Sequence, residues 1–350
     1  MENLKLALLG FGNAGQAFCR LLLEKQDKIR DTYKTDVTVT AIATASKGNI
    51  YDPKGIDLEA ALEDVCTSGR FSEKHKLTQL STMELARQAD YDVLVEMTPL
   101  NIFTGQPAAD HIKTAFSRKK HAITANKGPV AWFFRELAAM AREAGVYFFY
   151  ETTVMDGTPV FNLAEHTLKM AEVTEVSGIL NSTTNFILEE LALGADYDDI
   201  MERGRSLGFI EADPAMDIEG YDAAAKITAL LNVLMDAGIT PDQVKRKGIE
   251  DITVNDIKDA ASRGKVIKLL CRGVRKDDGS VEATVGPAEV SKDDILAGIN
   301  STTSIVSITT DLMKKVSIIE HEPEIEQTAY GVFGDLLRVL DNAAINAHVR

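Results

Sequence analysis

The sequence has few cysteines, and none of them is spaced like a metal or redox site. Only three occur in 350 residues, at Cys19, Cys66 and Cys271, and no CxxC is present. Disulfide frameworks and zinc sites need several closely spaced cysteines. The six histidines are scattered singly and match no metal-ligand spacing. These absences exclude a disulfide scaffold and a zinc site of familiar spacing, and they fit a reducing cytoplasm.

Basic residues and long apolar runs are also scarce. The chain carries 53 acidic and 38 basic residues, a formal net charge of −15. Such an excess repels nucleic-acid phosphates and anionic membrane surfaces. No apolar run approaches the roughly 18 residues that cross a bilayer, and the N-terminus lacks the pattern of a signal peptide. We therefore predict a soluble, unprocessed cytoplasmic protein that binds a small molecule and binds neither nucleic acid nor a membrane.

The length and a hydrophobic content of 45% favour two domains. Up to about residue 150, short apolar runs alternate with helical patterns. This alternation predicts an α/β domain with a Rossmann-type, doubly wound parallel sheet. Strands are predicted over 6–9, 37–43, 91–96, 121–124 and 146–150, with a polar excursion between the second and the third. Helices are predicted from residue 17, over 108–118 and over 132–144.

Glycine and proline punctuation from about Glu151 onward predicts a second, α+β domain. Its predicted strands are 173–180 and 284–290, and its predicted helices are 186–193, 222–235 and 260–270. Helical spacing over 328–339 predicts a last helix that returns to the first domain. The predicted division is 1–150 plus 328–350 for dinucleotide binding, and 151–327 for substrate binding and dimerisation.

A glycine-rich turn follows the first predicted strand. It reads Gly10-Phe11-Gly12-Asn13-Ala14-Gly15, a GxGxxG between a strand and a helix. The first glycine permits the turn, the second lets the backbone approach a pyrophosphate, and the third allows close helix packing. The helix N-terminus adds amide donors and a positive dipole. A glycine turn without a ligand is the alternative, disfavoured because three glycines cost backbone entropy. We predict that these six residues bind a dinucleotide.

The end of the second predicted strand lacks the acidic residue of NAD-selective sites. It reads Thr44-Ala45-Ser46-Lys47, with no carboxylate to hydrogen-bond the ribose or to repel a 2′-phosphate. Ser46, Lys47 and Lys54 are suited to bind that phosphate, although surface lysines are usually just solvated. We predict NADP as the favoured cofactor and NAD as the alternative.

Two more candidate cofactor contacts follow the strand predicted over 91–96. Thr98 and Pro99 lie just past its end, where ligands bind at the carboxyl edge of a parallel sheet. An ordinary turn is the alternative.

Three further segments resemble the homoserine dehydrogenase family. Thr124-Ala125-Asn126-Lys127 resembles its TANK segment, 178–188 resembles its GILNGTTNYIL, and 208–226 resembles its long G-[YF]-x-E-A-D-P-x-x-D-x-x-G-x-D-A-A-x-K. The resemblance runs in order from the glycine turn to 328–331. It implies NAD(P)-dependent interconversion of L-homoserine and L-aspartate 4-semialdehyde, on the route to threonine, methionine and isoleucine. It also implies a short form without an aspartokinase or a C-terminal regulatory domain.

The chemistry agrees with the residues of the long motif. Oxidising an alcohol by hydride transfer needs a base for the hydroxyl proton, and a desolvated lysine can serve. Asp222 and Lys226 are four residues apart in a predicted helix and can pair, although spacing alone would suggest a surface salt bridge. The resemblance implies that Lys226 carries the proton, with Lys127 as helper or competing candidate near the nicotinamide. It implies substrate contacts from further residues: Glu211, Asp217, Asp222, Thr183 and the Gly208 backbone.

The resemblance also implies a monovalent cation, Na⁺ or another, held largely by backbone carbonyls. The matching positions are Glu151, Val154, Asp156 and Thr158. Asp156 stands where small residues are usual, so its carboxylate either strengthens the site or points elsewhere. Gly331 is implied as a cofactor contact. The stretch 318–327 departs from the family, which has a glycine-rich loop there.

Two alternative functions are considered, and an oligomer is expected. The same fold suits a dehydrogenase of another small amino or hydroxy acid. A non-catalytic NADP sensor is disfavoured, because it needs no Lys127, Asp222 or Lys226. Because the family is oligomeric, we expect a homodimer formed through the second domain.

Overall fold

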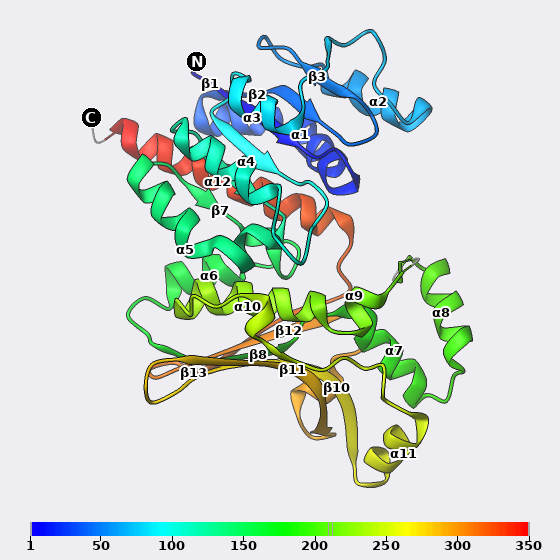
Figure 1. The fold of residues 1–350 in the computed structure, drawn as a ribbon. Helices are drawn as coiled ribbons and strands as arrows, with labels where there is room; N and C mark the ends of the chain where they lie inside the picture. The colour runs from blue at the N-terminus through cyan, green and yellow to red at the C-terminus, as the bar shows by residue number, and fades with distance from the viewer. Residues whose placement is uncertain (1, 209, 212, 349–350) are drawn as a thin grey trace. The chain divides into compact units, whose positions relative to one another are not determined.

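The computed structural model describes residues 2–208, 210–211 and 213–348, which form two compact units. Unit 1 comprises Met1–Pro159 and Glu324–Arg350, and unit 2 comprises Val160–Pro323 (Figure 1). The sequence placed these boundaries at 150/151 and 327/328. Within the described ranges, no helix combines the length and apolarity needed to cross a membrane.

Unit 1 contains a seven-stranded sheet in the order β4-β3-β2-β1-β5-β6-β7. Its five strands from β2 to β7 in that order pair in parallel, which confirms the predicted Rossmann-type sheet. These strands are β1 (Glu2–Leu9), β2 (Thr35–Ala43), β5 (Val93–Glu96), β6 (His121–Thr124) and β7 (Phe148–Phe149). The polar excursion adds an antiparallel edge that the sequence did not predict, made of β3 (Asn49–Tyr51) and β4 (Leu77–Thr78).

Alternating side chains give this sheet two buried faces, as a doubly wound sheet requires. Leu6 and Leu8 of β1 belong to one core cluster, with α1 (Asn13–Tyr33), α2 (Leu58–Ser68) and α12 (Ile325–His348). Ala7 and Leu9 belong to another, with α3 (Thr82–Gln88) and α4 (Ala108–Ser117). A third cluster joins α4 to α5 (Lys127–Ala144). The glycine turn is therefore held by a strand that is packed on both sides.

The last helix, α12, belongs to unit 1. The core residues Val332, Leu336 and Val339 of α12 pack in the same cluster as α1. Gly331 approaches the segment after β7 so closely that a Cβ there would lie 2.5 Å from Thr152 Oγ1. That segment begins with the short helix η1 (Glu151–Thr153).

Unit 2 contains a six-stranded sheet in the order β13-β12-β8-β10-β11-β9. Its strands are β8 (Val173–Ile179), β9 (Lys245–Arg246), β10 (Lys265–Arg275), β11 (Val281–Ser291), β12 (Ser304–Thr310) and β13 (Lys314–Glu320). All neighbours pair antiparallel except β9 with β11. The helix α10 (Tyr221–Met235) packs on one face, where a Cβ at Gly273 would lie 2.2 Å from a methyl carbon of Leu231. The other helical segments are α6 (Val160–Thr167), α7 (Ser182–Ala192), α8 (Tyr197–Ser206), α9 (Ala215–Ile218), η2 (Pro241–Gln243), α11 (Val254–Ser262) and η3 (Ile295–Gly298).

The predicted helix over 260–270 is wrong. The helix α11 ends at Ser262, Gly264 has φ +72°, and β10 begins at Lys265. The apolar residues there fit both a helical and a strand periodicity. Pairing with both β8 and β11 stabilises the strand. The hairpin β12–β13 was not predicted, and residues 318–320 of the divergent stretch form its end.

The tight seat of Gly331 predicts a specific effect on stability. Gly331→Ala should lower the free energy of unfolding by about 1–3 kcal/mol, because its Cβ would also lie 2.8 Å from Gly157 Cα. Gly334→Ala in the same helix is the matched control. Its Cβ would meet nothing within 4 Å, and alanine favours a helix over glycine by up to about 1 kcal/mol. Thermal unfolding of both variants checks this, and equal midpoints would contradict it.

Candidate functional site

The glycine turn has the geometry that its three glycines allow. Gly10 has φ +108°, and its N–H donates to Ala43 O at 2.9 Å. A Cβ at Gly10 would lie 2.2 Å from Met97 O, and one at Gly15 would lie 2.8 Å from Gly10 O. At Gly12, the N-cap of α1, a Cβ would meet nothing within 4 Å. The first and third glycines are thus needed for packing, and the second leaves the helix N-terminus accessible.

The N-terminus of α1 suits a phosphate. Gly12 provides no side-chain cap for the first amides, and no acidic residue lies in the first turn. These amides and the helix dipole therefore favour an anion. A cavity of about 530 Å³ opens at this point. It is lined by Gly10, Phe11, Gly12, Asn13, Ala14, Gly15, Ala43, Thr44, Ala45, Ser46, Lys47, Thr82, Met97, Thr98, Pro99, Pro107 and His111. The residues present fit the pyrophosphate of a dinucleotide.

The turn after β2 is ordered by its own polar groups. Thr44 N donates to Asn49 Oδ1 at 2.7 Å, and Lys47 N donates to Thr44 Oγ1 at 2.8 Å. Phe71 N donates to Lys47 O at 2.9 Å, and Phe71 packs on Phe11 of the glycine turn. None of the described residues that line the cavity is acidic. The turn therefore presents Ser46 and Lys47 without a carboxylate beside them.

Two other predicted cofactor contacts, Lys127 and Gly331, lie in different surroundings. Lys127 is the first residue of α5 and is half-buried. The preceding Asn126 caps that helix, and its Nδ2 donates to Thr98 O at 3.1 Å, so the Lys127 segment is tied to the Thr98 turn. Gly331 does not line the cavity and instead packs against Thr152. Thr82 and His111 line the cavity, and the sequence analysis missed both because long-range pairing brings them there.

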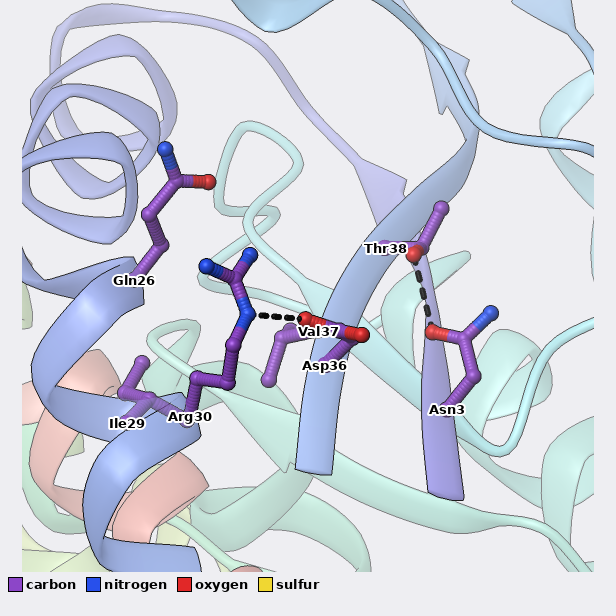
Figure 2. A pocket seen from close by; sticks show the side chains of 7 residues that line it. All are labelled: Asn3, Gln26, Ile29, Arg30, Asp36, Val37 and Thr38. Carbon is purple, nitrogen blue, oxygen red and sulfur yellow. Dashed lines mark hydrogen bonds and ion pairs between the residues drawn. The ribbon is translucent and has the colours of Figure 1, made fainter. Parts of the chain in front are cut away.

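A second hollow lies beside α1 and β2 but does not resemble a ligand site (Figure 2). It includes Asn3 near the start of β1, at the opposite end of that strand from the glycine turn. The one guanidinium in it is engaged, because Arg30 Nε donates to Asp36 Oδ1 at 2.7 Å and Nη1 donates to Asp27 Oδ1 at 2.9 Å. The charge of Arg30 is thus already balanced by two carboxylates.

Unit 2 gathers most of the predicted substrate residues into one cluster. Lys226 Nζ lies 3.2 Å from Asp222 Oδ2 and donates to Leu180 O at 2.8 Å. Both side chains are largely shielded, with 19% and 14% of their surfaces exposed. Gly220, with φ +79°, precedes α10 and directs Asp222 and Lys226 toward the end of β8. The pair is therefore a shielded one and not a surface salt bridge.

Asn181 joins two carboxylates in this cluster, a role that the sequence analysis missed. Its Nδ2 donates to Asp217 Oδ1 at 2.6 Å and to Asp222 Oδ2 at 3.0 Å. Its Oδ1 accepts from Thr184 N at 2.9 Å and so caps α7. The available signal was an asparagine before Ser-Thr-Thr, a residue type favoured at helix N-caps, but the predicted helix began only at residue 186.

The electrostatics of the cluster favour a cationic partner. Burial raises the pKa of Asp217, and the nearby Asp222 carboxylate raises it further. Hydrogen bonds from Asn181 and Thr183 and the charge of Lys226 lower it. Two neighbouring carboxylates with one lysine leave a local negative charge, which an ammonium group would balance.

Two predicted substrate residues lie outside this cluster. Glu211 is exposed, between residues 209 and 212 that lie outside the described part of the chain. Gly208 follows α8 with φ +78°, and its N–H donates to Arg205 O at 3.1 Å.

The predicted cation segment is held by α12. Glu151 is buried, and its N–H donates to Asp335 Oδ2 at 3.0 Å. Burial raises the pKa of Asp335 to about 7. Asp156 accepts from Thr328 Oγ1 at 2.6 Å, so its carboxylate points toward α12. Within the described ranges, no group of three or more His, Cys, Asp or Glu side chains could hold a metal ion. Val154 is buried and Thr158 N donates to Met155 O at 2.8 Å.

Comparisons with known proteins agree with this geometry. The family model "Homoserine dehydrogenase, NAD binding domain" matches residues 10–151, and the model "Homoserine dehydrogenase" matches residues 159–337. A homoserine dehydrogenase of Methanocaldococcus jannaschii is 36% identical over 96% of this chain and 98% of its own length. An NAD(+)-dependent homoserine dehydrogenase of Pseudomonas canavaninivorans is 32% identical over 98% of each chain.

A solved structure has the same fold. A hyperthermophilic archaeal homoserine dehydrogenase in complex with NADPH aligns with a TM-score of 0.81 and 26% identity, over 96% of this chain and 97% of that one. The glycine turn, the cluster around Lys226 and both family models therefore point to the same family. This chain belongs to the homoserine dehydrogenase family, the NAD(P)-dependent oxidoreductases that act on the hydroxyl group of homoserine.

Proposed function

We propose that unit 1 binds the dinucleotide and that unit 2 binds homoserine and carries its proton. The observation that carries this proposal is the shielded cluster of Lys226, Asp222, Asp217 and Asn181. The two carboxylates suit the ammonium group of the amino acid, and Thr183 and the Gly208 backbone complete the proposed contacts. Glu211, whose side chain is exposed, is a further proposed contact.

The proton step is assigned to Lys226. When homoserine is oxidised, its hydroxyl proton passes to the neutral Lys226 amine. A bound nicotinamide would supply the acceptor for the hydride that leaves the carbinol carbon. The C–O bond becomes the carbonyl of aspartate 4-semialdehyde, and the reverse step returns the proton from Lys226. Leu180 O and Asp222 hold the amine in place. Lys127, at the start of α5, is the competing candidate.

The assignment predicts the effect of removing Lys226. Lys226→Ala should lower kcat by about two to four orders of magnitude, because the general acid–base group is lost. Lys226→Arg should be nearly as poor, since a guanidinium does not release its proton near neutral pH. Steady-state kinetics with homoserine and related hydroxy acids measure both effects, and calorimetry should show unchanged affinity for NADPH.

Lys127→Ala is the control that separates the two lysines. If Lys127→Ala keeps substantial turnover, the result supports Lys226 as the proton carrier. Should Lys226→Ala keep wild-type kcat while Lys127→Ala abolishes it, Lys127 is the proton carrier.

We further propose NADP as the favoured cofactor. Ala45 stands where NAD-selective sites carry an acid, and Ser46 and Lys47 line the same cavity. The NAD(+)-dependent relative makes NAD the alternative.

Ala45→Asp tests this choice. A carboxylate there would repel a 2′-phosphate and hydrogen-bond a free ribose, so the ratio of kcat/KM for NADP over that for NAD should fall at least about tenfold. Ala45→Asn, of similar size but uncharged, is the matched control and should change the ratio much less. A wild-type enzyme that strongly prefers NAD would refute the proposal.

A homodimer formed through unit 2 is also proposed. Cys271 and Gly273 of β10 face α10, so the register places Arg272, Ser177 and Ser307 together on the opposite face of the sheet. Arg272 on that face is about half exposed and pairs with Glu175, and this face of the sheet is proposed to pair with a second copy.

Light scattering decides the assembly. We expect twice the chain mass of 38.2 kDa at working concentration. Replacing Ser307 by Arg should shift the equilibrium toward monomer, because a bulky charge would enter the proposed interface. A wild-type mass equal to one chain would exclude the dimer.

Two minor proposals concern a cation and the compartment. A monovalent cation, Na⁺ or another, is proposed at the backbone carbonyls around Glu151, Val154 and Thr158. The Asp156 carboxylate is already engaged by Thr328, so it adds little to that site. A cytoplasmic location is proposed because Cys19, Cys66 and Cys271 are free thiols.

A further inference from the structure

A fully buried glutamate lies beneath the cofactor cavity. Glu96 is the last residue of β5 and is 0% exposed. Its Oε1 accepts from both the backbone N–H of Thr98, at 3.2 Å, and the Thr98 hydroxyl. Its Oε2 is buried and has no hydrogen-bond partner among the described residues. A buried carboxylate with an unsatisfied oxygen is costly, so its retention needs an explanation.

Glu96 has polar neighbours on two sides, and these neighbours line the cavity. His111 of α4 is also 0% exposed, and its Nδ1 lies 3.5 Å from Glu96 Oε1 without forming a hydrogen bond to any described residue. On its other side, His111 Nε2 lies 2.9 Å from Thr82 Oγ1, at the start of α3. Thr82, His111 and Thr98 line the cavity, whereas Glu96 does not. The carboxylate therefore acts on a ligand only through its neighbours.

The hydrogen bond from Thr98 to Glu96 fixes what the hydroxyl can do. A threonine hydroxyl has one proton to donate and two lone pairs to accept with. Because the proton is given to Glu96, the hydroxyl can only accept from a ligand in the cavity. The backbone of Thr98 is fixed as well, with its N–H on Glu96 and its carbonyl on Asn126 Nδ2.

We propose that Glu96 is a positioning residue that holds the Thr98 hydroxyl as an acceptor for a hydrogen-bond donor of the bound cofactor. His111 packs beside Glu96 and contacts Thr82 through Nε2. The donor is an amino or hydroxyl group, either of the adenosine half or of the nicotinamide half. The inference rests on the proposed binding of the dinucleotide in this cavity.

The experiment measures NADPH affinity of the full chain by calorimetry. Thr98→Val keeps the shape of the side chain but removes the acceptor, and should raise the Kd about tenfold, the effect of one hydrogen bond. Thr98→Ser keeps the hydroxyl and should bind within about threefold of wild type. Glu96→Leu should raise the Kd as much as Thr98→Val, whereas Glu96→Gln, which keeps an acceptor oxygen, should stay near wild type.

The double variant Glu96→Leu/Thr98→Val tests whether the two residues act as one. Its Kd should be no worse than that of either single variant, because both remove the same interaction. The KM for homoserine should stay within about twofold in all variants, since the substrate cluster lies in unit 2. Parallel titrations with 2′,5′-ADP locate the donor: a weakened Kd assigns it to the adenosine half, and an unchanged one to the nicotinamide half.

Three results would overturn the inference: wild-type affinity of Thr98→Val, wild-type affinity of Glu96→Leu, or losses that multiply in the double variant. A Glu96→Leu protein that unfolds at a lower temperature but binds NADPH normally would show a purely structural role. If Glu96→Leu does not fold, Thr98→Val and Thr98→Ser still test the acceptor. Failure of the wild type to bind NADPH would instead refute the proposed function of the cavity.

Discussion

Unit 1 depends on the close parallel pairing of β1 with β5. The register runs from Leu6 opposite Val93 to Leu9 opposite Glu96, so the two following turns emerge side by side. A side chain at Gly10 would collide with the backbone at Met97, and its φ of +108° also requires glycine. With that contact made, α1 begins with its amides at the edge where β5 delivers Thr98. One backbone approach thus positions two sides of the proposed cofactor cavity.

Unit 2 solves a different problem, because it holds two carboxylates close together. Like charges in a shielded place repel, and burial alone would raise the pKa of Asp217. The amide of Asn181 gives one hydrogen bond to each carboxylate, and Lys226 forms an ion pair with Asp222. The cluster is therefore stable but still short of positive charge. In the proposed mechanism the substrate ammonium supplies the missing positive charge. The same interaction therefore both binds and orients homoserine.

The parts of this protein that sequence predicted have local signals. The glycine turn needs only six adjacent residues, and Asp222 with Lys226 needs one helical turn. The parallel sheet followed from alternating patterns. The strand β10 could not be told from a helix, because its identity depends on pairing with two strands distant in sequence. Glu96 and His111 gave no signal for the same reason: α4 and β5 meet only in the folded sheet. Gly331 was assigned to the cofactor, but its neighbours in space are Thr152 and Gly157.

The position of α12 bears on how the protein is made. A ribosome delivers the first 159 residues long before residues 324–348, yet the core of unit 1 contains Val332, Leu336 and Val339 of α12. The apolar side of α1 that faces these residues therefore stays uncovered in the nascent chain while all of unit 2 is being translated. Unit 2 is continuous in sequence, so all of its core residues are translated without interruption by another unit. The second half of the chain can thus complete its core before the first, and the N-terminal unit is the part exposed to aggregation during synthesis.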